Sequence, residues 1–342
     1  MKHFLCIGAF IGVSAAVLAP QAFAGPTFDA VKARGEVICG VHTGLYGFST
    51  PDERGQWTGI DVDVCRSVAA AMFGDASKVR FVPLSAQARL TALQSGEVDI
   101  LSRNTTWTLT RDTANGLNFT GVNYYDGQGF MVPTEMGITS ANELDDATVC
   151  VQTGTTTEKN LADWFRAQGK DFRPVTIEKY EEVTAAYLSG RCDAITSDAS
   201  QLAAIRANDT PNPDDHVILP EIISKEPLGP SVRHGDDQWF DLVKWSLYAT
   251  IEAEEAGVTS ENVEEMKANS TDPNIQRLLG ATPGMGEALG VSEEWAFNII
   301  KQVGNYGEIY SRTVGEKSKL GLPRGLNALW TDGGLMYAPP IR

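Results

Sequence analysis

The densest group of side chains that could bind a small ion lies in a polar loop, Ser102 to Asp112. The loop follows an apolar run at 98–101 that predicts a buried strand, and it contains four threonines together with Asn104 and Arg111. Such a segment buries little apolar area, so core packing does not explain it. Hydroxyls, backbone N–H groups and a guanidinium suit a small anion, and a carboxylate in particular. The loop therefore predicts a site for the α-carboxylate of an amino acid.

The segments around this loop predict a parallel sheet covered by helices. Expected strands at 37–41, 79–83 and 98–101 alternate with expected helices at 61–73 and 85–94. The helical spacing of apolar residues and suitable capping residues indicate where the helices begin and end. Strand–helix–strand order is typical of parallel strands joined by right-handed crossovers.

A second unit of the same kind follows, with strands at 147–152, 173–177 and 192–196 and helices between them. Residues 187–194 resemble residues 93–100, since both run from a helix end through Ser-Gly into a strand. Extended segments rich in glycine or proline, 127–133 and 225–230, could cross between the two units. We therefore expect two α/β lobes, lobe 1 at 25–130 and 229–342 and lobe 2 at 131–228. Lobe 1 would include a helical C-terminal extension.

The first 24 residues predict a secretory signal peptide. Lys2 is followed by an uncharged apolar run at 4–18 and by the small-x-small motif Ala22-Phe23-Ala24. Cleavage is expected after Ala24, which would release a soluble protein into the periplasm.

The net charge and the cysteines further limit which partners and which cellular compartment the protein can have. The net charge of −16 disfavours nucleic acid and anionic membranes as partners. Cys39, Cys65, Cys150 and Cys192 remain after the signal and predict two disulfides in an oxidising compartment. Of the three possible pairings we favour Cys39–Cys65 and Cys150–Cys192, because each then stays within one lobe. The alternative is that one or two cysteines remain buried thiols.

No motif predicts a metal or a cofactor. The histidines after the signal lack metal-ligand spacing, and neither a phosphate-binding loop nor a nucleophile elbow is present.

Four segments resemble a known family: 101–108 with Arg111, 150–158, 221–230 and the tail 325–330. Over nearly the whole mature length the chain is similar to periplasmic amino-acid-binding proteins of ABC importers (solute-binding protein family 3). Within that family it looks most like the general L-amino-acid binders. The resemblance implies two α/β lobes, joined by two hinge strands, that close on a ligand.

The resemblance also implies ligand contacts in lobe 1. Arg111 would hold the α-carboxylate bidentately, as planar guanidinium geometry allows. Thr106 would offer its backbone N–H to the carboxylate and its hydroxyl to the ligand amine, and the Asn104 carbonyl would accept from the amine. Arg89 stands where binders of acidic amino acids place an arginine that recognises the side chain.

Lobe 2 would complete the set. Thr156, at a helix N-terminus, would donate a backbone N–H to the carboxylate, and Asp198 would pair with the α-ammonium group. Each residue has a structural alternative: Arg111 on a helix surface, residues 155–157 as a helix cap only, Asp198 as a turn residue and Arg89 on a solvated helix face.

Leu45 and Ala86 stand where related single-ligand proteins carry aromatic residues, and such replacements are consistent with a broad ligand range. We therefore expect a non-enzymatic, monomeric protein that captures polar, acidic or amide L-amino acids and delivers them to an inner-membrane ABC permease. One alternative is an enzyme on the same fold, similar to cyclohexadienyl dehydratases, with Asp126 or Glu158 as acid or base. The other is a sensory ligand-binding module.

Overall fold

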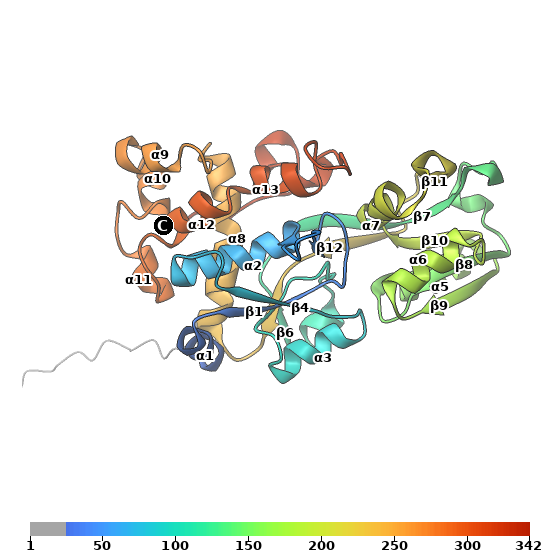
Figure 1. Ribbon diagram of the computed structural model, residues 1–342, viewed down its shortest axis with the longest axis horizontal. Helices are drawn as coiled ribbons and strands as arrows, with labels where there is room; N and C mark the ends of the chain where they lie inside the picture. Colours follow the sequence, from blue (N-terminus) through green and yellow to red (C-terminus); the bar gives the residue numbers. More distant parts are fainter. Residues whose placement is uncertain (1–24) are drawn as a thin grey trace, which may run out of the picture.

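The computed structural model describes residues 25–342, so the expected signal peptide lies outside the described residues. Two α/β bodies are linked by two extended strands, β7 (Tyr124–Pro133) and β12 (Ser224–Leu228), which pair antiparallel with each other (Figure 1). We call the bodies lobe 1 and lobe 2. The expected two-lobed α/β architecture is confirmed.

The sheet of lobe 1 has the strand order β4-β1-β5-β13-β6. β4, β1 and β5 run parallel, as expected, but β13 pairs antiparallel with β5 and β6. The sheet is therefore mixed, because β13 enters from lobe 2 by the second connection. The strands are β1 (Val37–Val41), β4 (Val79–Pro83), β5 (Ile100–Leu101), β6 (Leu117–Phe119) and β13 (Ser231–Arg233), with a separate hairpin of β2 (Thr50–Pro51) and β3 (Trp57–Thr58).

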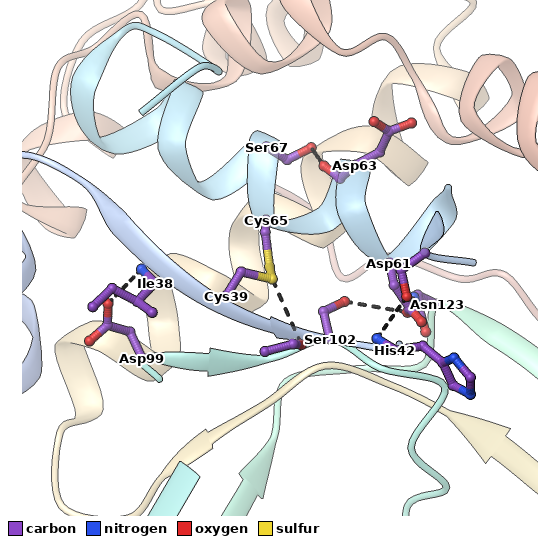
Figure 2. The surroundings of a disulfide bond; sticks show 12 residues. Ile38, Cys39, His42, Asp61, Asp63, Cys65, Ser67, Asp99, Ser102 and Asn123 are labelled. Carbon is purple, nitrogen blue, oxygen red and sulfur yellow. Dashed lines mark hydrogen bonds between the residues drawn. A yellow bond between two sulfur atoms is a disulfide. The ribbon is translucent and has the colours of Figure 1, made fainter. Parts of the chain in front are cut away.

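Helices enclose this sheet, so β1 is buried along its whole length. A disulfide between Cys39 on β1 and Cys65 fastens one of them, α2, to the sheet (Figure 2). Trp239 is fully buried, and its indole N–H donates to the Asp99 carbonyl at 3.1 Å. The helices are α1 (Pro26–Arg34), α2 (Ile60–Phe73), α3 (Ala88–Ser95), α4 (Leu109–Asp112) and α8 (Asp237–Glu255).

Lobe 2 repeats the arrangement with the strand order β11-β7-β10-β8-β9. β10, β8 and β9 are parallel, whereas β7 is antiparallel to its neighbours. The second disulfide, Cys150–Cys192, lies within this lobe, so both pairs are those favoured from the sequence. The strands are β8 (Ala147–Gln152), β9 (Phe172–Ile177), β10 (Ala194–Asp198) and β11 (His216–Ile218), and the helices and short helical turns are α5 (Thr156–Gln168), α6 (Tyr180–Leu188), α7 (Ala199–Ala204), η1 (Thr134–Met136), η2 (Ala141–Glu143), η3 (Ile205–Asp209) and η4 (Pro213–Asp215).

The internal resemblance has a physical basis at the start of β5 and β10. Both strands begin two residues later than expected, after Asp99 and Asp193. Each aspartate donates its backbone N–H to a neighbouring strand and accepts that strand's N–H on its side chain: Ile38 N to Asp99 Oδ2 at 2.8 Å (Figure 2) and Thr148 N to Asp193 Oδ2 at 2.6 Å. A side-chain oxygen thus replaces a ladder carbonyl at the same point of both lobes.

The C-terminal extension packs on lobe 1 (Figure 1). Its buried side chains belong to two hydrophobic core clusters that also include residues of lobe 1. Trp295, Ile299 and Ile300 of α12 are buried against α2 and α8. Across residues 25–342, no helix combines the length and the apolar character needed to cross a bilayer. The elements are α9 (Val263–Asn269), α10 (Pro273–Leu278), α11 (Met285–Leu289), α12 (Trp295–Gln302), α13 (Tyr306–Thr313), η5 (Gly325–Asn327) and η6 (Trp330–Asp332).

Candidate functional site

The polar loop faces lobe 2 across a small cavity of about 20 Å³, which we call the interlobe cavity. Its walls come from the carboxyl ends of parallel strands in both lobes, the edge where open α/β sheets bind ligands. From lobe 1 it is lined by Arg89, Arg103, Asn104 and Thr106, and from lobe 2 by Gln152, Thr155, Thr156, Thr157, Ser197, Asp198 and Gln201. Five of the six predicted ligand residues therefore meet here.

Arg111, the sixth, lies directly behind this wall. Its guanidinium Nη1 donates to the Thr106 carbonyl at 2.8 Å, and only 6% of the residue is exposed. Thr108 caps the short helix α4 by accepting from the Arg111 N–H at 3.3 Å. The alternative of an arginine on a helix surface is therefore wrong.

Asp61 holds the loop in shape, and the sequence did not single it out. The Asn104 N–H donates to Asp61 Oδ2 at 2.7 Å, and Ser102 and Asn123 donate to Oδ1 (Figure 2). Asn104 has a positive φ of 30°, a conformation that costs a non-glycine residue energy and persists only where the surrounding structure holds it. Burial raises the pKa of Asp61, against the lowering effect of these hydrogen bonds and of Arg103. Asp61 thus stabilises the backbone turn that presents the Asn104 carbonyl.

Three arginines make the lobe 1 wall strongly positive. Arg89, Arg103 and Arg111 are all at most 6% exposed, so the alternative of Arg89 on a solvated helix face is also wrong. Burial lowers the pKa of each, that of Arg103 to about 9, and the neighbouring arginines lower those of Arg89 and Arg103 further. Within the described residues, Arg89 Nε and Arg103 Nη2 have no hydrogen-bond partner. Arg103 was missed in the sequence, although it lies in the polar loop itself.

Opposite this positive wall, lobe 2 places a helix N-terminus and the carboxylate of Asp198. Thr156 is the first residue of α5, after the N-cap Thr155, whose hydroxyl accepts from Glu158 N at 3.1 Å. First-turn N–H groups lack partners inside the helix and favour an anion. Asp198 ends β10 and is 6% exposed. Burial raises its pKa well above the usual value, as do the charges of Asp126 and Glu226.

The two acid–base candidates of the enzyme alternative are engaged elsewhere. The Asp126 carboxylate accepts from the Ser200 hydroxyl and from Gly127 N at 2.8 Å, and burial raises its pKa to about 6. The Glu158 carboxylate accepts from Gly154 N at 2.9 Å, folding back over its own helix turn. Neither lines the interlobe cavity.

Leu45 and Ala86, expected near the ligand side chain, are buried but do not line the interlobe cavity. Leu45 instead belongs to a core cluster that also includes Phe48. Arg89, Arg103 and Gln201 line the cavity instead.

A much larger cavity, about 680 Å³, lies between lobe 1 and the C-terminal helices. Both of its arginines, Arg66 and Arg312, pair with Asp63 in the same wall, and Lys301 pairs with Glu264. We therefore place the candidate site at the smaller interlobe cavity, where buried charges converge from both lobes.

The lobes touch around this cavity. His42 packs edge-on against Tyr180 with ring centroids 5.0 Å apart, and Asn104 Nδ2 donates to Gln201 Oε1 at 3.4 Å. A volume of about 20 Å³ suits one water molecule. Seating an amino acid therefore requires the lobes or the lining side chains to move apart.

The fold and this two-sided polar site define a class. The chain belongs to the bacterial extracellular solute-binding proteins, family 3, whose sequence model matches residues 37–262. The extension after residue 262 lies beyond that match.

Three similar proteins show what the chain resembles over its full length. It is 55% identical to the general L-amino acid-binding periplasmic protein AapJ of Rhizobium johnstonii, covering 100% of both chains. It is 54% identical to the glutamate/glutamine/aspartate/asparagine-binding protein BztA of Rhodobacter capsulatus, covering 98% of this chain and 99% of the other. The solved ABC transporter periplasmic binding protein from Brucella ovis, with glutathione bound, superposes with a TM-score of 0.90 at 57% identity, covering 92% and 98%.

These relatives are binding proteins of transporters rather than enzymes, which supports a non-enzymatic role for this chain. The expected class, a periplasmic solute-binding protein of amino-acid ABC transport, is confirmed.

Proposed function

We propose that this protein binds L-amino acids between its lobes, favouring acidic and amide side chains, and delivers them to an ABC permease in the inner membrane. The observation that carries the proposal is the meeting of Arg89 and Arg103 with Asp198 across the interlobe cavity, with the buried Arg111 directly behind the lobe 1 wall. A zwitterion with a polar side chain needs such opposed charges within a few ångströms.

The α-carboxylate would lie against Arg111 and the backbone N–H groups of Thr106 and Thr156. Arg111 is held next to Thr106 by its hydrogen bond to that residue's carbonyl. Thr156 adds the dipole of α5 from the opposite lobe. Because the donors come from both lobes, a bound carboxylate would favour the closed arrangement.

The α-ammonium group would be received by the Asn104 carbonyl, the Thr106 hydroxyl and Asp198. The raised pKa of Asp198 supports this role, because a cationic partner would stabilise its charged form.

The ligand side chain would meet Arg89. Its Nε, like Nη2 of Arg103, has no partner among the described residues and can donate to a carboxylate or amide oxygen. BztA, as its name states, binds glutamate, glutamine, aspartate and asparagine. AapJ is named for general L-amino acids. A broad range with acidic and amide ligands included fits both.

We take lobe 1 as 25–130 with 229–342 and lobe 2 as 131–228, moving about β7 and β12 as hinge strands. The mature protein would begin at Gly25, act in the periplasm and be a monomer. Light scattering with and without ligand tests the monomer.

Calorimetric titration with the twenty L-amino acids tests the function. Several polar members should bind with a Kd of about 1 μM or below, a range within reach of charge-assisted contacts in an enclosed site. The matching D-amino acids are the control, since they cannot place all three substituents. If none of the L-amino acids binds, the proposal is contradicted. Turnover of a bound ligand would revive the enzyme alternative.

A further inference from the structure

Glu226 joins the two lobes at the candidate site, and it was not among the site residues predicted from the sequence. It lies in β12, which runs beside the polar loop: Trp107 N donates to Pro227 O at 2.8 Å and Gly229 N to Thr105 O at 3.1 Å. The residue is 1% exposed. This places a buried carboxylate between the loop of lobe 1 and helix α5 of lobe 2.

Both carboxylate oxygens of Glu226 are fully used. Oε2 accepts from the Thr106 hydroxyl at 2.6 Å and from the Thr156 hydroxyl at 2.8 Å. Oε1 accepts from Asn160 Nδ2 at 2.8 Å and from the Ser224 hydroxyl at 2.6 Å. Four donors from three separate segments therefore hold it in one orientation.

The direction of these hydrogen bonds follows from chemistry. An ionised carboxylate can only accept, and a hydroxyl has one proton to donate. Thr106 and Thr156 must therefore both direct their single proton to Glu226. Their oxygens lie 3.2 Å apart and keep only lone pairs for any other partner.

We propose that Glu226 is a positioning residue that sets the polarity of these two hydroxyls, so that they accept from the α-ammonium group of the ligand. Each threonine then offers a backbone N–H donor and a hydroxyl acceptor. Donor and acceptor match the two charged groups of an α-amino acid. This inference rests on the proposed function and adds a reason for discriminating amino ligands from hydroxy ligands.

The test compares L-glutamate with (S)-2-hydroxyglutarate, which differs only in carrying a hydroxyl in place of the ammonium group. Binding of L-glutamate by the unaltered protein is tested first, since its failure would concern the proposed function. In Glu226→Met both threonine protons are released and can donate to a ligand hydroxyl. The affinity ratio, that for L-glutamate divided by that for (S)-2-hydroxyglutarate, should therefore fall by about tenfold or more, the scale of a hydrogen bond to a charged group.

Two further variants distinguish the orientation of the threonine hydroxyls from the charge of Glu226 and from a loss of folding. Glu226→Gln keeps one acceptor oxygen for the threonines, while its amide can donate to Ser224 Oγ and to a turned Asn160, so the ratio should stay within about threefold. Thr156→Val removes one oriented hydroxyl and leaves the buried carboxylate in place, so the ratio should fall even where Glu226→Met does not fold.

Glu221→Met is the matched control. Its carboxylate also accepts from a serine hydroxyl, that of Ser140, but within lobe 2 and away from the interlobe cavity. Its ratio should equal that of the unaltered protein. An unchanged ratio in Glu226→Met or Thr156→Val overturns the proposal, as does an equal loss in Glu226→Gln and Glu226→Met.

Discussion

Asn327, in the C-terminal extension, forms two hydrogen bonds to the backbone of Tyr125, one through its side-chain carbonyl and one through its amide nitrogen. Its Oδ1 accepts from Tyr125 N at 2.6 Å, and its Nδ2 donates to Tyr125 O at 3.1 Å. A side chain 202 positions away thus supplies the pairing that a neighbouring strand would give to β7. Tyr306 reinforces the contact by donating its hydroxyl to the Asn123 carbonyl at 2.9 Å. The extension is therefore hydrogen-bonded to the start of β7, the first connection between the lobes.

Replacing Asn327 should weaken that connection. Asn327→Ala leaves the N–H and C=O of Tyr125 unpaired, at a cost of about 1–3 kcal/mol in the free energy of unfolding. Chemical denaturation measures the loss, and calorimetry should show a changed ligand affinity. Asn142→Ala, at an exposed position in lobe 2, is the control and should change neither. Unchanged stability in Asn327→Ala would show that the pairing does not contribute.

Arg111→Lys tests bidentate recognition. Lysine keeps the charge but loses the planar fork, so affinity for L-glutamate should fall by about 2 kcal/mol or more, and by up to about 5 kcal/mol in Arg111→Ala. Arg80→Lys, at an exposed arginine paired with Glu36, is the matched control. Titration calorimetry reads both. Affinity retained in Arg111→Ala would remove this residue from the site.

Gly154→Ala tests the close approach of the lobes. A Cβ there would lie 2.8 Å from Gln87 Cγ, across the interlobe contact, at a φ of +78°. Gly190→Ala has a similar φ of +74° with nothing within 4 Å, so it shares the backbone strain but not the collision. Both variants should lose about 1 kcal/mol of stability, and only Gly154→Ala should also lose ligand affinity. Equal affinities in the two variants would contradict the contact.

Ligand binding should release protons near pH 6. Burial raises the pKa of Asp198, and that of Asp126 to about 6, so part of the pair is protonated there. A bound ammonium group favours the charged carboxylate and lowers these pKa values, so affinity should rise as the pH increases from about 5 to about 7.5. Calorimetry in two buffers of different ionisation enthalpy counts the protons. Proton uptake would contradict the assignment of Asp198.

The same groups predict the pH dependence of folding. Between the unfolded pKa near 4 and the folded pKa near 6, Asp126 binds more protons when folded. Stability should therefore fall as the pH rises through that window, by up to about 3 kcal/mol for a shift of about two units. Urea denaturation at a series of pH values measures it, with Asp126→Asn expected to flatten the curve.

Much of the scaffold was predictable because its signals are local. The strand at 79–83 and the strand at 147–152 have the bounds expected from apolar runs, and both Ser-Gly turns lead into strands. Two features were not predictable from such patterns. The short strands β6 and β13 have no distinctive run of residues, and β13 runs antiparallel to both of its neighbours, which makes the sheet mixed rather than parallel.

The candidate site divides in the same way. The polar loop and the threonines before α5 are marked by composition and capping chemistry, so the sequence by itself determined two lobes and a donor-rich site between them. Only the tertiary structure decided that Asp61 shapes the loop, that Arg103 joins the wall and that Glu226 spans the lobes. These contacts join residues that are distant in the sequence: Asn104 and Asp61 are 43 positions apart, and Thr106 and Glu226 are 120 positions apart. A buried carboxylate and a surface one look alike in sequence, because burial depends on which distant segments the fold brings together.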